Sequence, residues 1–235
     1  MIQLENVTFT YNGSEEKGNL KNINLSIRQG EVILLCGESG CGKTTLTRLI
    51  NGLIPWYYEG ELNGIVKVDG KEIREQPLHI LSRKIGSVFQ NPRSQFFNVD
   101  TTSEIAFSCE NQGLPEDEIR ERIHQTVSLF QIENLIDRNI FHLSGGEKQK
   151  IACASVSAGE PEIFVLDEPS SNLDVVAIED LKHIISCWKS AGKTVIIAEH
   201  RLYYLTELAD RIIYMQNGEI RREWTTAEFL GLSQR

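Results

Sequence analysis

Apolar and polar residues alternate along residues 2–10 and again along residues 20–27, the period of strands with one buried face. The apolar positions are Ile2, Leu4, Val7 and Phe9 in the first run and Ile23, Leu25 and Ile27 in the second. The turn-forming segment 11–14 follows the first run. The pattern predicts an antiparallel sheet near the start of the chain.

Residues 32–35 and 163–166 are continuous apolar runs, and residues 194–198 are apolar after Thr194, which is typical of parallel strands that are covered on both faces. Further strands are predicted at 64–70 and 85–90, and an Asn217-Gly218 turn predicts a hairpin over residues 212–220.

Helical spacing predominates from Ser94 to Gly159, where strand patterns fade. Pro115 and the acids after it form a helix start, and apolar residues continue at helical spacing to Phe130. We predict one domain over residues 1–235, with an α/β core at 1–90 and 160–235. The core carries a mostly parallel sheet with flanking helices and an antiparallel β subdomain, and residues 91–159 form an inserted helical lobe.

One glycine-rich segment between a predicted strand and a predicted helix matches the pattern G-x-x-x-x-G-K-[ST]. It reads Gly37-Glu38-Ser39-Gly40-Cys41-Gly42-Lys43-Thr44-Thr45. Its glycines allow the backbone N–H groups to point at a phosphate, and Lys43 adds a full positive charge. The Thr44 hydroxyl is placed to hold Mg²⁺. The segment predicts a nucleotide site.

Polar residues follow three of the predicted core strands, at Gln90, Asp167-Glu168 and His200. Because parallel strands present their carboxyl ends to the ligand crevice, Asp167 could hold Mg²⁺ or its water, and Glu168 could polarise an attacking water. Surface acids at a strand end are the less favoured alternative. For Gln90 and His200 an ordinary structural role stays open, as it does for Tyr11, which could stack on adenine or end a strand.

The pentapeptide Leu143-Ser144-Gly145-Gly146-Glu147 opens another predicted helix. Ser144 with Glu147 fits a capping box. The two glycines would also expose N–H groups to a phosphate, so a second anion site is the competing interpretation.

The sequence has 235 residues and a net charge of -9, which argues against nucleic acid as the main partner. Neither a run of ~20 apolar residues nor a signal-peptide pattern is present, so we expect a soluble or peripheral cytosolic protein. The cysteines are scattered and odd in number, which predicts reduced thiols. Alkylation of Cys41, within the glycine-rich segment, is expected to inhibit nucleotide binding.

The ordered set of motifs resembles the ATP-binding cassette (ABC) ATPases over nearly the whole chain. The shared features are an aromatic after the first strand, G-E-S-G-C-G-K-T-T, F-Q, L-S-G-G-E, an apolar run before D-E-P, S-N-L-D and a late histidine. The resemblance implies that Tyr11 stacks on adenine, that Gly37 through Thr45 hold the phosphates of ATP, and that Thr44, Gln90 and Asp167 serve Mg²⁺. It also implies that Glu168 is the catalytic base, assisted by Lys43 and Gln90, and that His200 contacts the γ-phosphate.

By the same resemblance, Ser144, Gly145, Gly146 and Glu147 would reach the nucleotide of a facing ABC subunit, and Asp174 would lie at the subunit interface. Hydrolysis would then open an ATP-joined dimer. The family's signature usually ends in Gln, so Glu147 is a departure that adds negative charge near this nucleotide.

The segment Gln90-Asn91-Pro92-Arg93-Ser94-Gln95-Phe96-Phe97 is similar to that of the ATPases of energy-coupling factor (ECF) transporters, which import vitamins and metal ions. There it helps form a groove for helices of a transmembrane coupling subunit, and Phe96 and Phe97 would be the apolar anchors. Alternatively, these aromatics pack inside the helical lobe.

The resemblance thus implies an ATP hydrolase at the cytoplasmic face of the membrane, peripheral to a coupling subunit and a substrate-binding membrane protein. Many relatives carry a C-terminal extension that helps dimerisation, and since this sequence ends at Arg235 we expect the dimer to rest mainly on ATP and the membrane partner. An ATPase of an ordinary ABC importer or exporter is the alternative, and a non-transport ABC protein is a more distant one. The pairing is left open between a homodimer and a heterodimer.

Overall fold

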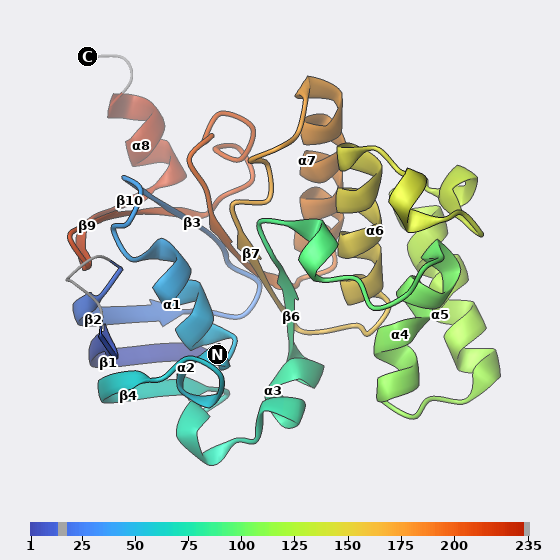
Figure 1. The fold of residues 1–235 in the computed structure, drawn as a ribbon. Helices are drawn as coiled ribbons and strands as arrows, with labels where there is room; N and C mark the ends of the chain where they lie inside the picture. The colour runs from blue at the N-terminus through green and yellow to red at the C-terminus, as the bar shows by residue number, and fades with distance from the viewer. Residues whose placement is uncertain (14–17, 233–235) are drawn as a thin grey trace.

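The computed structural model describes residues 1–13 and 18–232 (Figure 1). Ser14, the last residue of the first predicted turn, therefore lies outside the described residues, as does Arg235. The strands are β1 (Ile2–Tyr11), β2 (Leu20–Ile27), β3 (Val32–Gly37), β4 (Gly60–Val68), β5 (Lys71–Glu72), β6 (Ile85–Val88), β7 (Ile163–Asp167), β8 (Thr194–Ala198), β9 (Arg211–Gln216) and β10 (Glu219–Thr225). The α-helices are α1 (Lys43–Ile50), α2 (Leu53–Trp56), α3 (Leu78–Lys84), α4 (Thr101–Asn111), α5 (Glu116–Phe130), α6 (Gly145–Ser157), α7 (Val175–Ser190) and α8 (Thr226–Leu232).

The central sheet has six strands in the order β10-β9-β3-β8-β7-β6. Its strands run parallel from β9 to β6, and β10 joins the edge antiparallel through the predicted Asn217-Gly218 hairpin. Both turn residues have positive φ, at 50° and 81°, as a tight two-residue turn requires. Successive residues of β3 enter opposite cores, with Leu34 on one face and Leu35 on the other. Burial on both faces explains why the central strands are apolar throughout.

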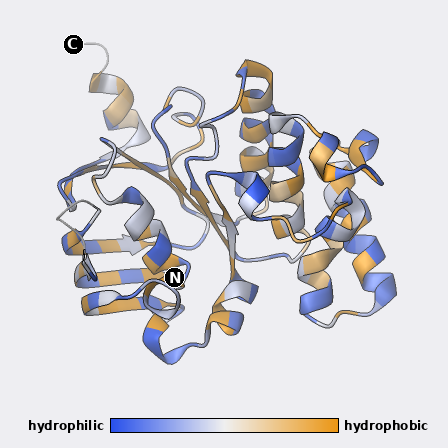
Figure 2. Cartoon of the chain, viewed as in Figure 1, coloured by the Kyte–Doolittle hydropathy of each residue, from blue (hydrophilic) through white to orange (hydrophobic). Residues whose placement is uncertain are grey.

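The second sheet is antiparallel, in the order β2-β1-β4-β5. Apolar and polar residues alternate along its strands, which appear as alternating orange and blue bands in Figure 2. Their buried side chains join those of Leu46, Leu49 and Ile50 from α1 and one face of the central sheet in a single core. Helix α1 therefore packs against both sheets, which fixes the loop that precedes it.

The opposite face of the central sheet is covered by α6 and α7, and α4 and α5 lie beyond them (Figure 1). The Phe164 ring of β7 stacks on Trp188 of α7 with centroids 4.0 Å apart. Helix α6 contacts both β6 and α4, so it connects the core to the outer helices.

The predicted fold class is confirmed: an α/β core, an antiparallel β subdomain and a helical insertion. The division at residues 90 and 160 stays a prediction. Strand β4 begins at Gly60, earlier than predicted, because residues 60–63 pair with β1 as far as Tyr11. Across the chain segments that the structure describes, no helix is long and apolar enough to cross a membrane.

Candidate nucleotide site

The glycine-rich segment forms a loop between β3 and α1, as predicted. In the described structure no side chain caps α1, whose N-cap is Gly42 with a φ of 105°. Its first N–H groups therefore remain available to an anion. A Cβ at Gly37 would lie 2.2 Å from the Met215 carbonyl oxygen, and one at Gly42 would lie 2.8 Å from Leu20 Cδ2. These contacts and the positive φ angles restrict both positions to glycine.

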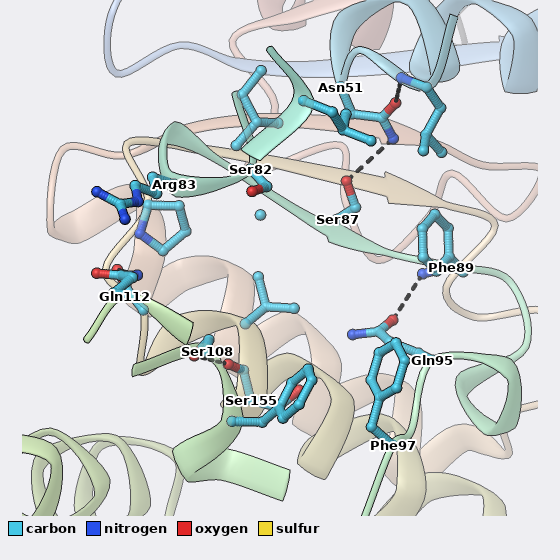
Figure 3. A pocket seen from close by; sticks show the side chains of 18 of the residues that line it. Asn51, Ser82, Arg83, Ser87, Phe89, Gln95, Phe97, Ser108, Gln112 and Ser155 are labelled. Carbon is cyan, nitrogen blue, oxygen red and sulfur yellow. Dashed lines mark hydrogen bonds between the residues drawn. The ribbon is translucent and has the colours of Figure 1, made fainter. Parts of the chain in front are cut away.

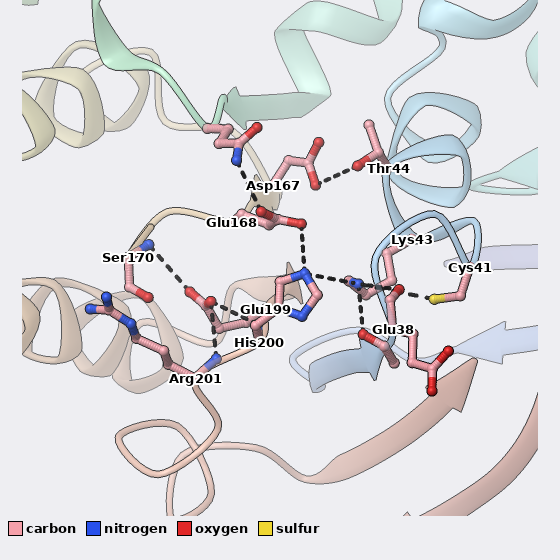
Figure 4. A network of polar contacts seen from close by, with 12 residues as sticks. Glu38, Cys41, Lys43, Thr44, Asp167, Glu168, Ser170, Glu199, His200 and Arg201 are labelled. Atoms are coloured by element: carbon pink, nitrogen blue, oxygen red, sulfur yellow. Dashed lines mark hydrogen bonds and ion pairs between the residues drawn. The ribbon is translucent and has the colours of Figure 1, made fainter. Parts of the chain in front are cut away.

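Lys43, the first residue of α1, is buried beside this loop, with 4% of its surface exposed. Its Nζ donates to the carbonyl oxygens of Gly37 at 2.9 Å and Glu38 at 3.2 Å. The same atom lies 3.3 Å from His200 Nε2 (Figure 4). Phosphate oxygens would compete for this ammonium group. Cys41 is also buried, so its alkylation would require the loop to open.

Asp167 ends β7 beside the start of α1, where the Thr44 hydroxyl donates to its Oδ1 at 3.1 Å. Burial raises the pKa of Asp167, and the bond from Thr44 counteracts part of that effect. A desolvated carboxylate of this kind gains from a nearby cation. The hydroxyl, carboxylate and amide oxygens of Thr44, Asp167 and Gln90 are hard ligands that suit Mg²⁺. Within the described ranges no cluster of three His, Cys, Asp or Glu side chains could hold a metal, so such an ion would also need phosphate or water oxygens.

Glu168 follows with a φ of 46°, a left-handed conformation that is uncommon outside glycine. Its N–H donates to the Ala198 carbonyl oxygen of β8 at 2.8 Å. Its Oε2 accepts from Gln90 Nε2, and its Oε1 contacts His200 Nε2, each at 3.0 Å (Figure 4). The strand ends therefore bring Gln90 and His200 together around the Glu168 carboxylate, and His200 in turn contacts Lys43.

Tyr11, at the end of β1, lies beside this loop. Its hydroxyl is 3.1 Å from Thr45 Oγ1 and accepts from Arg48 Nη1 at 3.0 Å. The Tyr11 ring meets Phe9 edge to face, and Arg48 lies over the Tyr58 ring at 4.0 Å. Stacking on adenine stays a prediction. Arg48 and Tyr58 were not predicted, because their link to Tyr11 depends on how α1 and the loop before β4 fold against β1.

The Ser144 segment begins α6 as a complete capping box, so this prediction is confirmed. Glu147 Oε2 accepts from the Ser144 N–H at 2.7 Å, and these bonds to Ser144 lower the pKa of Glu147. Arg138 Nη1 lies 3.4 Å from Glu147 Oε1. A role toward a facing nucleotide stays a prediction for Ser144, Gly145, Gly146 and Glu147.

A pocket of about 350 Å³ extends from the glycine turn of α6 to Gln90, with Gly145, Gln90 and Asn172 among its lining residues. Asp174, two residues further on, caps α7 by accepting from the Ala177 N–H at 2.8 Å. Its place at a subunit interface stays a prediction.

Phe96 and Phe97 point to different surroundings. Phe97 is 75% exposed and lines a pocket of about 290 Å³ between β6, α3 and α4 (Figure 3). Phe96 is partly buried and packs against the core cluster that joins the helical region to the central sheet, which agrees with the alternative interpretation for this residue. Of the two, Phe97 is the more exposed, and its contact with another protein stays a prediction.

Sequence reasoning gave no role to Glu199, a buried acid directly before His200. The pattern that identified Asp167, an acid at the end of an apolar strand, could have drawn attention to it. Its partners come from a distant loop, which the spacing of residues does not reveal.

Comparison with known proteins places these features in one family. The sequence matches the ABC transporter family over residues 20–171, more than half of the chain. It is 42% identical over 221 residues to a Pyrococcus horikoshii protein that carries the name of an ABC transporter ATP-binding protein, covering 94% of this chain and 78% of that one. A Treponema denticola protein with the same kind of name is 53% identical over 234 residues, which are all of this chain and 48% of that protein. The chain belongs to the ABC transporter family.

Solved structures agree with this assignment. CbiO1 of Clostridium perfringens, described as part of the ABC transporter complex CbiONQ, superposes with a TM-score of 0.87 at 30% identity over 99% of this chain and 91% of that one. The cassette MJ0796, solved as a dimer in a post-hydrolysis state with ADP and Pi, gives a TM-score of 0.82 at 28% identity over 96% and 99%. The chain therefore shares the fold of an ATP-binding cassette. The chain spans about half the length of two Treponema denticola relatives that it matches.

Proposed function

We propose that this chain is the ATP-hydrolysing subunit of a membrane importer of the ECF type, which takes up vitamins or metal ions. The observation that carries its hydrolytic part is the Glu168 carboxylate, held between Gln90 and His200 beside Lys43. A carboxylate fixed at both oxygens is oriented to polarise water, which is the main task of the protein in phosphoryl transfer.

In the proposed reaction Glu168 orients the attacking water and accepts its proton. Lys43 and the N–H groups before α1 bind the phosphates, and His200 contacts the γ-phosphate while it holds Glu168. Thr44, Gln90 and Asp167 would hold Mg²⁺, which neutralises charge on the phosphates when bound. Tyr11 would support the adenine.

The proposed assembly is a pair of ABC ATPase subunits at the cytoplasmic face of the membrane. Ser144 to Glu147 of one subunit face the nucleotide of the other, and Asp174 lies between them. Closure on ATP and opening after hydrolysis move a transmembrane coupling subunit, which works with a substrate-binding membrane protein. The dimeric MJ0796 cassette and the CbiONQ assignment of CbiO1 support this arrangement.

The ECF assignment rests on the segment from Gln90 to Phe97. Its two ends lie in different places, since Gln90 contacts Glu168 and Phe97 lines the groove. A helix of a coupling subunit that rests on Phe97 would therefore act on the catalytic glutamine through one short segment. Phe107 stacks on Phe97 with centroids 4.7 Å apart and would support it from behind.

Affinity purification of the tagged protein from native membranes in mild detergent tests this proposal. We expect a coupling subunit and a small substrate-binding membrane protein to copurify. Phe97→Ala should reduce their recovery by about tenfold or more, since an aromatic anchor in a groove contributes ~2 kcal/mol. Leu129→Ala is the control, because Leu129 is also an exposed apolar residue, at 50%, but lies on α5 outside the groove.

Recovery of a large or paired permease instead would identify an ordinary ABC transporter. Recovery of ribosomal or chromosomal partners would contradict the transport function. If Phe97→Ala and the parent recover equal amounts of the membrane partners, the proposed docking of a coupling subunit in this groove would be contradicted.

A further inference from the structure

We infer that Glu199 is a positioning residue that ties His200 to the loop of residues 170–174, so that contacts made by this loop act on the catalytic histidine. Glu199 directly follows β8 and is 1% exposed. The proposed reaction gives Glu199 no task. It lies between the segment that carries His200 and the loop that follows Glu168, and both His200 and Glu168 have a task in that reaction (Figure 4). The inference rests on ATP hydrolysis by this chain and not on the importer type.

One carboxylate oxygen of Glu199 holds the histidine segment. Its Oε1 accepts from the backbone N–H of His200 at 2.8 Å and from that of Arg201 at 3.2 Å. These bonds fix the backbone from which the imidazole reaches Glu168 and Lys43. A shift of this backbone would move Nε2 away from both contacts.

The other oxygen holds the loop that follows Glu168. Its Oε2 accepts from the Ser170 N–H at 3.2 Å and from the Tyr204 hydroxyl at 3.0 Å. Ser170 is completely buried and Tyr204 is 2% exposed. Burial and the bond to Glu199 raise the pKa of Tyr204, so this hydroxyl stays a donor.

A second link runs parallel to the first, because Arg201 Nη1 donates to the Leu173 carbonyl oxygen at 3.1 Å. The loop also returns to the catalytic carboxylate residue, since the Ser171 N–H donates to the Glu168 carbonyl oxygen at 3.2 Å. It ends at Asp174, where Val175 and Val176 of α7 are 71% and 73% exposed. Displacement of this exposed end is therefore transmitted to His200 through Glu199 and Arg201.

The chemistry requires a carboxylate. Four donors converge on Glu199, and a carboxylate has acceptor sites for all of them. A glutamine of the same shape offers one acceptor oxygen, and its NH₂ group would face two donors. Glu199→Gln therefore uncouples the His200 segment from the loop of residues 170–174 without opening a cavity.

The test compares Glu199→Gln with Glu31→Gln in ATP hydrolysis by the purified chain. Glu31 is the control, because it is a partly buried glutamate whose Oε2 accepts from the Arg28 N–H at 2.8 Å, but it lies directly before β3, at the end of this strand opposite the glycine-rich loop. We expect Glu199→Gln to lower kcat by about tenfold or more with KM within about threefold, since small misplacements of catalytic groups are this costly. Glu31→Gln should keep the parent kcat.

A double-mutant cycle separates positioning from general destabilisation. In a His200→Ala background, measured under single-turnover conditions, Glu199→Gln should change the rate by less than about twofold, because its effect passes through the histidine. If the double variant loses rate by the product of the two single losses, the inference is overturned. It is also overturned if Glu199→Gln keeps the parent kcat. If that variant does not fold, Tyr204→Phe removes one donor and keeps the ring, and an unchanged kcat there overturns the inference too. Absence of hydrolysis by the parent chain would instead contradict the proposed function.

Discussion

Asp167 illustrates how a single residue can serve the site at the expense of the fold. Its carboxylate is partly buried at the end of β7, and this burial raises its pKa. The hydrogen bond from Thr44 offsets part of the desolvation. The charge is therefore costly until a cation or a bound nucleotide–metal complex compensates for it.

We predict that Asp167→Asn makes the fold more stable at pH 7.5 in the presence of EDTA and abolishes Mg²⁺-dependent hydrolysis. Because the folded pKa lies above the usual value of about 3.9, the native state binds more protons than the unfolded state between these two values. The parent's stability therefore falls as pH rises through that window, and it stays lower above it. Asparagine has no such charge and can still accept from Thr44.

Melting temperatures measured from pH 8 to pH 4.5 test this expectation, with Asp117→Asn on the exposed surface of α5 as the control. The advantage of Asp167→Asn should shrink toward acid pH. An advantage that grows toward acid pH, or a less stable variant at pH 7.5, would contradict it.

Several site residues could be predicted individually, because each stands at the end of a strand that its apolar run reveals. Gln90, Asp167 and His200 belong to this group, and the structure brings their strand ends together. The left-handed backbone of Glu168 and the partners of Glu199 could not be predicted in this way. Both depend on the packing of the loop after β7 against the segment after β8.

At the scale of elements, the loop between β3 and α1 is fixed from two sides. Strand β9 approaches it closely enough that a Cβ at Gly37 would overlap the Met215 carbonyl oxygen. β2 approaches Gly42 in the same way through Leu20. The shape of the phosphate site thus depends on strands from both sheets.

We predict that Gly37→Ala weakens ATP binding by about tenfold or more, because the backbone must move to admit the methyl group at a φ of 147°. Binding of a fluorescent ATP analogue measures the effect, with circular dichroism as the check on folding. Gly231→Ala in α8 is the control, since a Cβ there would meet no described atom within 4 Å apart from those of its chain neighbours and its own helix backbone. Gly40→Ala, where φ is 78° but the space is open, should have an intermediate effect. Equal affinities for the Gly37 and Gly231 variants would show that the loop tolerates a side chain.

Elements with strong periodicity were predictable and short surface elements were not. The central strands and α7 follow directly from their apolar positions. Helix α3 buries one residue, Leu81, and α8 buries none, so neither has a periodic pattern to detect. Their positions are set by the elements before and after them.

At the scale of the whole molecule, the net charge of -9 bears on how two such chains meet around ATP. The proposed contact places Glu147 of one subunit toward the triphosphate of the other. Its pKa is lowered, so the carboxylate is charged at neutral pH, and Arg138 at 3.4 Å neutralises it only in part because both groups are partly exposed. The departure from glutamine therefore adds repulsion at the proposed interface.

We predict that Glu147→Gln strengthens ATP-dependent dimerisation by about three- to tenfold at low salt, since removal of one like charge from a partly exposed interface contributes ~1 kcal/mol. The glutamine oxygen can still accept from the Ser144 N–H, so the capping box is retained and the stability of the monomer should change by less than ~1 kcal/mol. Sedimentation of both forms in a Glu168→Gln background, in which hydrolysis is blocked, measures the dissociation constant directly. The gain in dimer affinity should fall toward zero at about 0.5 M salt, because salt at this concentration screens exposed charges almost completely. Glu121→Gln removes the same charge from the exposed surface of α5 and should leave the constant unchanged. Weaker or equal dimerisation of Glu147→Gln would mean that the carboxylate makes a favourable contact with the facing nucleotide, or that this end of α6 does not face it.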